Sequence, residues 1–532
     1  MKKLLIIILA INLFAQNEIS EDWLKEQPKT IAKDFYIWRY LDQNITPKQA
    51  LDACGQIQRF NNKLFFRYID KSDNKTLKSY KSCVKSKTKD LLNKKPYCIE
   101  AGLSVYDATK LPSKSLKKVI NRVKNEYPQL AKKLKILNST IPFVTLEQVD
   151  KKTFFDTFNQ VGSVYRAKYF NHHISLKTIK RLRDNKKFAQ TIKLIVTNTK
   201  MNKAQKSLLN ITPEGLNFKS TFHLAINAIR HDKKDMALIY LENAFNKAYY
   251  KMDKDNIAFW QYKLTKEKQY LDKLINSWDI NIYSLYATSF MNKKQNNIIF
   301  DIEQKTTTIK EFDTTSPFEW IKILEDSKNI DKNKLSSYQY QFTNESTLGH
   351  LAFVQEKYDK YRNSYFITPY EKFIGKLPQK RQALIYALAR QESRFIPTSI
   401  STSYAMGAMQ IMPFLSKAIA KQLKDDYDID KQLDPKTNLK YANHHLNYLE
   451  KNLKHPLFIA YGYNGGIGFT KRILKSGLFK KGKYEPYLSM ELLPFDETKK
   501  YGKKVLANYY IYKNHIDKKE KINFNSLLNI IN

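Results

Sequence analysis

The chain has 532 residues, more than one ordinary hydrophobic core accommodates, so two or three domains are expected. Hydrophobic residues make up 42% of the chain and charged residues 27%, a composition that excludes a largely disordered protein. Only 14 residues are glycine, well below the roughly 7% of an average protein, so a largely helical chain is expected.

The formal net charge of +41 requires a partner or an explanation. Such a charge suits nucleic acid, an anionic membrane face or a carboxylate-bearing polymer. It also has a purely compositional explanation, because lysine, asparagine and isoleucine are all abundant, as biased codon usage would produce. No recognisable nucleic-acid-binding motif accompanies the charge, so nucleic acid is not an expected partner.

The N-terminus reads MKKLLIIILAINLFAQNE, with two lysines, an apolar run from Leu4 to Phe14, and then Ala15. The run is too short to span a bilayer, and its flanks fit a secretory signal peptide over residues 1–15. The alternative is an N-terminal anchor helix, although no cysteine near the cleavage point is available to accept a lipid. We predict an exported protein without an integral membrane span in its mature form.

Three cysteines follow, Cys54, Cys83 and Cys98. Export permits one disulfide with one thiol left over, and the pairing cannot be deduced from the sequence. The spacing matches no zinc site, and there is no histidine-rich run to support one. We expect neither a metal nor another cofactor.

Residues 16–291 are predicted to form an α-superhelical domain. The pattern is clearest over residues 222–264, where three apolar helix faces follow one another and the polar turn RHDKKD separates the first two. An isolated helix pair cannot bury its apolar face, so stacked antiparallel pairs are the natural architecture. The fold class that follows is mainly α.

Residues 292–365 are predicted to form a helical linker domain, because the apolar pattern loosens there. Within it, Ser316 and Pro317 are typical of the N-cap and first residue of a helix. Thr368 and Pro369 repeat this signal, which places the last domain at residues 366–532. Ten of the 14 glycines lie after residue 348, so this last domain is expected to be compact with special turns.

The stretch ALARQESRFIP, residues 387–397, places Glu392 at helical spacing from apolar residues. Pro397 disfavours helical geometry at the residue before it, so the helix should end near Phe395 with Glu392 in its last turn. Burial and the negative end of the helix dipole both favour the protonated carboxylic acid, which is what a general acid requires. The alternative is a glutamate paired with a basic side chain, but Arg390 and Arg394 do not share its face.

Two later stretches are unlike ordinary core sequence. SISTSYAMGAMQIMP, residues 399–413, is typical of a tight loop in which Gly407 permits close approach or a positive φ, and Gln410 is an amide able to donate and accept. IAYGYNGGIG, residues 459–468, is predicted to present Tyr463 and Asn464 from a tight turn, as for a sugar face and its polar edge. Its glycines do not follow a strand, which argues against phosphate binding.

Four motifs occur in the order and approximate spacing of the soluble lytic transglycosylases, whose catalytic domain is similar to goose-type lysozyme: ARQESRF, GAMQIMP, AYGYNGG and LPFDETKKYGKKVLANYY. The match is strong from residue 366 onward, and weaker echoes at residues 259–263 and 280–289 resemble the superhelical region of the same family. The resemblance implies an N-terminal α-superhelix, a helical linker and a C-terminal lysozyme-like α domain.

The resemblance also implies the roles of seven residues. Glu392 matches the catalytic acid and Tyr501 the tyrosine near it, while Ser401, Gln410, Met412, Tyr463 and Asn464 fall at substrate-binding positions. Departures from the family pattern are GAMQ for the common GLMQ, the lengthened AYGYNGG, and Ala442 where a glycine is usual. These departures concern the preference for particular sugars more than the chemistry.

The activity that the resemblance implies is cleavage of the MurNAc–GlcNAc β-1,4 bond of peptidoglycan without water, giving 1,6-anhydromuramic ends. It implies a periplasmic enzyme whose partners are glycan strands, with cell-wall assembly proteins as further candidates. Most glycoside hydrolases use two carboxylates, but the next acidic residue after Glu392 is Asp425, so one acid would also have to serve as base.

Two alternatives remain open at this point. A muramidase would use the same acid with water as nucleophile, and Asp496 or Glu497 could then supply the second carboxylate. The other alternative is a non-catalytic helical scaffold that binds peptidoglycan. The intact Glu392 and Gln410 argue against it.

Overall fold

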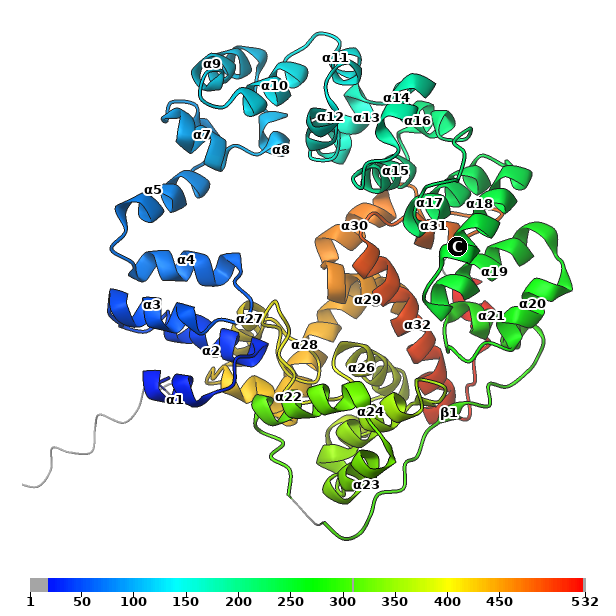
Figure 1. Ribbon diagram of the computed structural model, residues 1–532. Coiled ribbons are helices and arrows are strands. Elements are labelled where there is room, and N and C mark those ends of the chain that lie inside the picture. The colour runs from blue at the N-terminus through cyan, green and yellow to red at the C-terminus, as the bar shows by residue number, and fades with distance from the viewer. Residues whose placement is uncertain (1–17, 309–310, 530–532) are drawn as a thin grey trace, which may run out of the picture. The chain divides into compact units, whose positions relative to one another are not determined.

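The computed structural model describes residues 18–308 and 311–529, so the predicted signal peptide, residues 1–15, lies outside the described residues. The regular secondary structure of the described part is almost wholly helical, with 33 α-helices, three short 3-10 helices and two strands of two residues each (Figure 1). The prediction of a mainly α fold is confirmed. Within the described residues, no helix combines the length and the apolar character needed to cross a bilayer.

The described residues divide into two compact units, each built from two segments of the chain. Unit 1 combines residues 18–81 with residues 299–448, and unit 2 combines residues 82–298 with residues 449–529. The predicted domains 16–291, 292–365 and 366–532 divide the chain in a different way, by sequence pattern, and stay a prediction. Three elements cross the boundaries between the units: α5 (Lys75–Val84), β1 (Ile298–Ile299) and α28 (Pro435–Leu453).

The other elements of unit 1 are α1 (Glu21–Glu26), α2 (Ile31–Tyr40), α3 (Pro47–Gly55), α4 (Asn62–Lys71), α22 (Pro317–Asp326), η1 (Ser327–Asn329), α23 (Lys332–Gln341), η2 (Glu345–Thr347), α24 (Leu348–Tyr358), β2 (Ser364–Tyr365), α25 (Glu371–Ile374), α26 (Gln379–Glu392), α27 (Pro413–Leu423) and η3 (Asp430–Leu433). The two strands form a two-stranded sheet.

The other elements of unit 2 are α6 (Thr88–Leu91), α7 (Pro96–Gly102), α8 (Val105–Ala108), α9 (Ser113–Val123), α10 (Pro128–Leu137), α11 (Pro142–Gln148), α12 (Lys151–Phe158), α13 (Ser163–Tyr169), α14 (Leu176–Leu182), α15 (Phe188–Val196), α16 (Asn202–Ser207), α17 (Phe218–Arg230), α18 (Lys234–Lys247), α19 (Lys251–Thr265), α20 (Lys268–Ile275), α21 (Ile282–Phe290), α29 (Pro456–Gly465), α30 (Ile467–Lys475), α31 (Tyr487–Glu491), α32 (Asp496–Ile516) and α33 (Phe524–Asn529).

Unit 1 joins the N-terminal helices to the loop at residues 399–412. Apolar side chains of α2, α3 and α4 share one buried cluster with Tyr404 and Met406 of that loop. Asn61 donates to the Tyr404 hydroxyl at 3.0 Å, and Lys63 donates to the Ser403 carbonyl at 2.7 Å. The N-terminal segment therefore packs directly against a loop that lies more than 300 residues later in the sequence.

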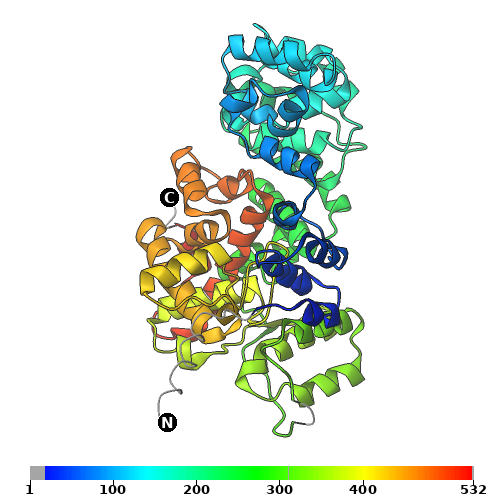
Figure 2. The same cartoon turned by 90° about the vertical axis from the view of Figure 1, so that its left-hand side faces the viewer.

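Unit 2 contains the stacked helices predicted from residues 222–264. These residues form α17, α18 and α19, each packed on the next, and the series continues through α20 and α21 (Figures 1 and 2). The predicted faces are buried: Ile226, Leu241 and Trp260 are all almost inaccessible to solvent. Since each helix covers the apolar face of its neighbour, the prediction of stacked helix pairs is confirmed here.

The two predicted helix starts had different outcomes. Ser316 is the N-cap of α22 and accepts a hydrogen bond from the Glu319 N–H, with Pro317 as first residue, as predicted. The start at Thr368–Pro369 was wrong, because Tyr370 adopts φ +65° and the helix begins at Glu371. The Tyr370 hydroxyl donates to the Phe395 carbonyl at 2.7 Å, so a tertiary contact holds this unfavourable conformation.

The structure also gives the disulfide pairing that the sequence left open. Cys83 and Cys98 are bonded, with 15 residues of sequence separation, and Cys54 is a half-buried free thiol. Burial raises the pKa of the Cys54 thiol to about 11, so this cysteine is almost wholly protonated and unreactive at neutral pH.

Reducing the Cys83–Cys98 bond should lower the free energy of unfolding of unit 2 by about 3 kcal/mol, because a loop of this length is released in the unfolded chain. Urea titration followed by circular dichroism, with and without dithiothreitol, measures the shift. The Cys54→Ser variant should keep the sensitivity to reductant, and the double variant Cys83→Ser, Cys98→Ser should lose it. A wild-type transition that ignores reductant would contradict the assigned bond.

Candidate active site

Glu392 is the last residue of α26, and its side chain is half-exposed. The helix ends three residues before the predicted Phe395, because Ser393 leaves the helix and Arg394 and Phe395 both have positive φ. Every residue from Ala383 to Ala389 is buried, so the helix is covered all round, where the sequence predicted a single apolar stripe. A rigid, buried helix thus carries a carboxyl group to a partly solvated end.

A buried carboxylate holds the turn that follows Glu392. Glu356, on α24, is 4% exposed and lies 2.7 Å from an Arg390 guanidinium nitrogen and 3.1 Å from one of Arg394. Arg390 also donates to the Tyr365 carbonyl at 2.9 Å and lies over the Phe366 ring. The two arginines that flank Glu392 in sequence therefore both pair with the Glu356 carboxylate. We name these three residues the arginine clamp.

The loop at residues 399–412 lies beside the same helix end. Ser393 Oγ donates to the Ala408 carbonyl at 2.8 Å, which joins the turn after Glu392 to the loop. Gly407 has φ +80°, and a Cβ there would lie 2.3 Å from the Gln432 carbonyl oxygen. The prediction that Gly407 supplies both a positive φ and close approach is confirmed.

Asn438 supports this loop from α28 and is fully buried. Its Oδ1 accepts from the Met409 N–H at 2.8 Å, and its Nδ2 donates to the Met406 carbonyl at 3.1 Å. A single amide side chain therefore satisfies backbone groups on both sides of Gly407, which fixes the position of the loop.

Two of the three predicted substrate-binding residues of the loop form hydrogen bonds with the loop backbone through their side chains. Ser401 Oγ accepts from the Ala405 N–H at 2.9 Å, and Gln410 Nε2 donates to the carbonyls of Ser399 and Gly407 at 2.9 and 2.8 Å. Both side chains are half-exposed, as is Met412, which is the N-cap residue of α27. The bonds to the loop orient the Gln410 amide and leave part of its surface accessible.

Tyr463 and Asn464 belong to a helix and do not lie in the predicted tight turn. They occupy the last turn of α29, and the sharp turn comes two residues later at Gly466, with φ +84°. Asn464 Nδ2 donates to Glu497 Oε1 at 3.1 Å, and Asn464 Oδ1 accepts from Thr498 Oγ1 at 2.8 Å. The amide is therefore held by the first turn of α32, with Tyr463 and Asn464 both half-exposed.

Tyr501 lies on α32 and is buried, with 6% of its side chain exposed. The adjacent Gly502 lets α32 approach α29 closely, because a Cβ at that position would lie 2.1 Å from Tyr461 Cε1. Tyr501 and Asn464 are thus presented by two helices in direct contact within unit 2.

The predicted site residues fall into two groups. Glu392, Ser401, Gln410 and Met412 come together in unit 1, around the helix end and the loop that it contacts. The remaining three, Tyr463, Asn464 and Tyr501, lie in unit 2 on α29 and α32.

The carboxylates considered as second catalytic groups are engaged in other contacts. Asp425 forms an ion pair with Lys440 at 2.6 Å, which together with nearby hydrogen bonding lowers the pKa of its carboxyl group. In unit 2, Asp496 pairs with Lys193 at 3.2 Å and Glu497 accepts from Asn464.

Glu356 and Asn438 are the site residues that sequence reasoning missed. Glu356 carries a weak signal, since it follows Ala352 by one helical turn in LGHLAFVQEKY. Asn438 carries none, because an asparagine near a helix start resembles an ordinary surface residue. Both act through tertiary contacts that connect segments distant in sequence.

Replacing Glu356 by glutamine should lower the free energy of unfolding by about 3–5 kcal/mol, because two arginines lose their buried counter-charge. Asp425→Asn is the matched control, since it removes one partner of an ion pair at the surface and should change stability little. Chemical denaturation measures both variants. Equal, small effects would mean that the clamp does not hold the turn.

Gly407→Ala should destabilise the protein by at least about 2 kcal/mol, because the added methyl meets backbone and the φ angle is unfavourable for alanine. Gly468→Ala places its methyl at 3.6 Å from a flexible arginine side chain, so it should leave stability nearly unchanged. Thermal unfolding of both variants provides the comparison, and a Gly407→Ala protein as stable as wild type would contradict the loop geometry.

The comparisons with known proteins agree with this geometry. Residues 370–485 match the family described as Transglycosylase SLT domain. Soluble lytic murein transglycosylases of Salmonella typhimurium and Escherichia coli K12 are 27% and 28% identical over 220 and 209 residues. These matches cover 40% and 38% of this chain but only 33% and 32% of the relatives, so the chain spans about a third of the length of the curated relatives it matches.

Solved structures extend the likeness of the fold to nearly the whole chain. The 70 kDa soluble lytic transglycosylase Slt70 from Escherichia coli superposes with a TM-score of 0.50 and 14% identity, covering 95% of this chain and 89% of that one. An inactive mutant of lytic transglycosylase Slt from Pseudomonas aeruginosa gives a TM-score of 0.50 and 13% identity, covering 94% and 89%. The chain thus has the all-α superhelical fold of these enzymes, and its residues 370–485 match the transglycosylase SLT family.

Proposed function

We propose that the protein is a peptidoglycan lytic transglycosylase, which cleaves the MurNAc–GlcNAc β-1,4 bond and leaves a 1,6-anhydromuramic end. The observation that carries the proposal is the placement of Glu392 at the end of a buried helix, next to the loop at residues 399–412. The match of residues 370–485 to the SLT family supports the same chemistry.

In the proposed reaction Glu392 acts twice. As a carboxylic acid it gives its proton to the glycosidic oxygen, and the bond between that oxygen and C1 of muramic acid breaks. As a carboxylate it then takes the proton of the muramic C6 hydroxyl, whose oxygen forms a bond to C1 of the same sugar. Glu392 ends protonated as it began, and no water is consumed.

The arginine clamp supports the position of this carboxyl group. The buried Glu356 carboxylate pairs with Arg390 and Arg394 and so holds the turn at which α26 ends and Glu392 is presented. Gln410, with its amide nitrogen bonded to the loop, is proposed to contact the sugar through its oxygen. Ser401 and Met412 are proposed to line the same groove from the loop.

Tyr463, Asn464 and Tyr501 complete the proposal. Tyr463 is proposed to contact a sugar face and Asn464 a polar edge, and Tyr501 to hydrogen-bond near Glu392 or the departing oxygen. The domains 16–291, 292–365 and 366–532 are proposed as superhelix, linker and catalytic domain. A periplasmic location after removal of residues 1–15, and recruitment by cell-wall assembly proteins, belong to the same proposal.

Purified glycan strands should yield muropeptides lighter by one water than the products of a muramidase, as measured by mass spectrometry. Glu392→Gln should abolish these products, because the amide can neither give nor take the proton, while circular dichroism and thermal unfolding stay as in wild type. Glu325→Gln, at an exposed surface ion pair, is the matched control and should keep full activity.

The other results would be equally informative. Products with the mass of hydrolysis would replace the transglycosylase by a muramidase, and no products from the wild-type protein would leave a peptidoglycan-binding scaffold. A Glu392→Gln variant that cleaves at the wild-type rate would remove Glu392 from the mechanism.

A further inference from the structure

A cavity of about 240 Å³ lies within unit 2. Its walls come from α17, α19, the start of α21, the end of α31 and the first turns of α32. Its lining combines buried polar groups with an apolar wall, which is the usual character of a small-molecule site.

Two buried, uncharged side chains in this lining each carry an acceptor atom without a hydrogen-bond partner. His223 and Asn256 are 5% and 7% exposed, and within the described part of the chain nothing pairs with His223 Nε2 or Asn256 Oδ1. The Asn256 amide nitrogen donates to Glu491 Oε1 at 3.0 Å, so its oxygen is the atom left over. Leaving such a buried atom unsatisfied is unfavourable, so a donor on a ligand would be bound favourably.

The tautomer of His223 follows from the hydrogen bond that its Nδ1 forms. Nδ1 lies 2.6 Å from the Lys219 carbonyl oxygen and must therefore carry the proton, which leaves Nε2 as an acceptor. Burial, with a further contribution from Lys499, lowers the pKa of His223 to about 4, so the ring is neutral near pH 7. Both unpaired atoms thus require O–H or N–H groups from an occupant.

The charges around the cavity are balanced, in contrast to the chain as a whole. Glu491 is paired with Lys503, with the Tyr283 hydroxyl donating to it at 2.9 Å, and Lys500 lies 3.6 Å from Asp253. The ionisable lining consists of four lysines and four carboxylates, Lys219, Lys499, Lys500, Lys503, Asp253, Glu491, Asp496 and Glu497. A lining without net charge favours an uncharged ligand, although the chain carries +41.

The apolar wall of the cavity indicates which kind of uncharged ligand would fit. Phe218 and Phe222 stack with ring centroids 5.9 Å apart at 22°, and Met252 lies in the same lining. Stacked rings offer a flat apolar surface, which suits the C–H face of a sugar ring better than a flexible charged chain.

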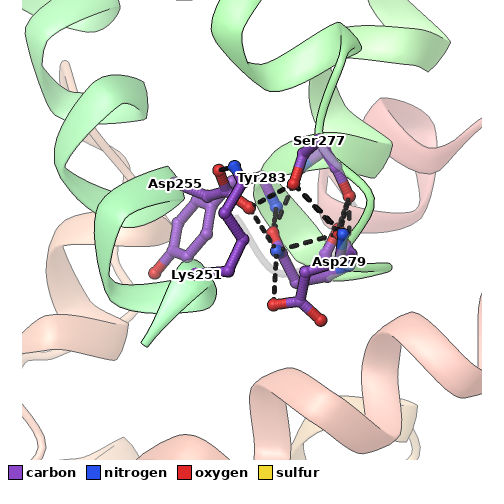
Figure 3. Close-up of polar contacts among 7 residues, drawn as sticks. Lys251, Asp255, Ser277, Asp279 and Tyr283 are labelled. Carbon is purple, nitrogen blue, oxygen red and sulfur yellow. Dashed lines mark hydrogen bonds and ion pairs between the residues drawn. The ribbon is translucent and has the colours of Figure 1, made fainter. Parts of the chain in front are cut away.

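Hydrogen bonds of Asp255 hold α19, the helix that carries Asn256, in place. Figure 3 shows Asp255 accepting from Ser277 Oγ at 2.6 Å, with Lys251 and Tyr283 nearby. Asp255 also accepts from Asn281 Nδ2 at 2.8 Å, which ties α19 to the start of α21. The cavity is therefore formed before any ligand arrives, and binding would require little reorganisation.

The cavity also borders a residue of the proposed active site. Glu497 lines the cavity and accepts from Asn464 Nδ2, so the first turn of α32 contacts both. We propose that this cavity binds an uncharged, hydroxyl-bearing N-acetylhexosamine unit of a glycan strand, outside the sugars at the cleaved bond. His223 Nε2 and Asn256 Oδ1 accept from its hydroxyl or amide groups, and Phe218 covers its apolar face. The assignment rests on the proposed function, since it takes the glycan from that substrate.

The test uses the full chain in the inactive Glu392→Gln form, with methyl-labelled methionine and NMR. Met252 reports on the cavity and Met412 on the catalytic loop, and chitotetraose, an oligomer of N-acetylglucosamine, is the probe. We expect the Met252 signal to shift and saturate. Asn256→Leu should raise the apparent Kd for that shift at least tenfold.

Asn227→Leu is the matched control. Asn227 is also a buried asparagine with an unpaired Oδ1 and one Nδ2 bond, to the Gln205 carbonyl, but it does not line the cavity. It should lose comparable stability and keep the Met252 shift. If Asn256→Leu fails to fold, Phe218→Ala, at a half-exposed position, should weaken the same shift, with Phe245→Ala on α18 as its control.

The results separate this proposal from the proposed function. A Met412 shift without a Met252 shift would overturn the cavity site and leave the enzyme proposal standing. A Met252 shift without a Met412 shift would support the cavity and count against the catalytic loop as a glycan site. A Met252 response to free stem peptide but not to chitotetraose, or equal binding by the Asn256→Leu and Asn227→Leu variants, would overturn the saccharide assignment.

Discussion

The ion pairs between Glu356 and the two arginines around Glu392 are the constraint on which the rest of unit 1 depends. Two guanidinium groups lie close to a buried helix end, and only a buried carboxylate from another helix makes that arrangement stable. Because α24 provides this carboxylate, α26 can end abruptly and the chain can pass through two residues of positive φ. The position of Glu392 follows from that turn.

The loop beside Glu392 is held by a second kind of constraint. Two backbone segments pack closely at a residue that has no side chain. Gly407 brings backbone against backbone, and the Asn438 amide satisfies the peptide groups on either side. The same device recurs in unit 2, where Gly502 admits the Tyr461 ring and brings α32 against α29. Proposed functional residues are thus placed by glycines and buried amides, which carry no chemistry of their own.

The net charge of the whole chain and the charges of its buried groups follow different rules. The excess of lysine gives the chain a strongly positive formal charge, suited to a polymer with carboxylates, yet the buried Glu491 is paired with the buried Lys503. Burying an unpaired charge costs far more than exposing one, so a buried charged group needs a counter-charge or hydrogen bonds whatever the composition of the surface. This explains how a neutral cavity exists in so basic a protein.

The sequence by itself determined the mainly α class, the stacked helices around residues 222–264, the helix carrying Glu392 and the need for glycine at position 407. These are local properties, set by periodicity, capping and φ angles. Only the tertiary structure decided the Cys83–Cys98 pairing, the helical setting of Tyr463 and Asn464, and the roles of Glu356 and Asn438. Each of these depends on contacts between residues distant in sequence, and local patterns carry no record of which distant groups will meet.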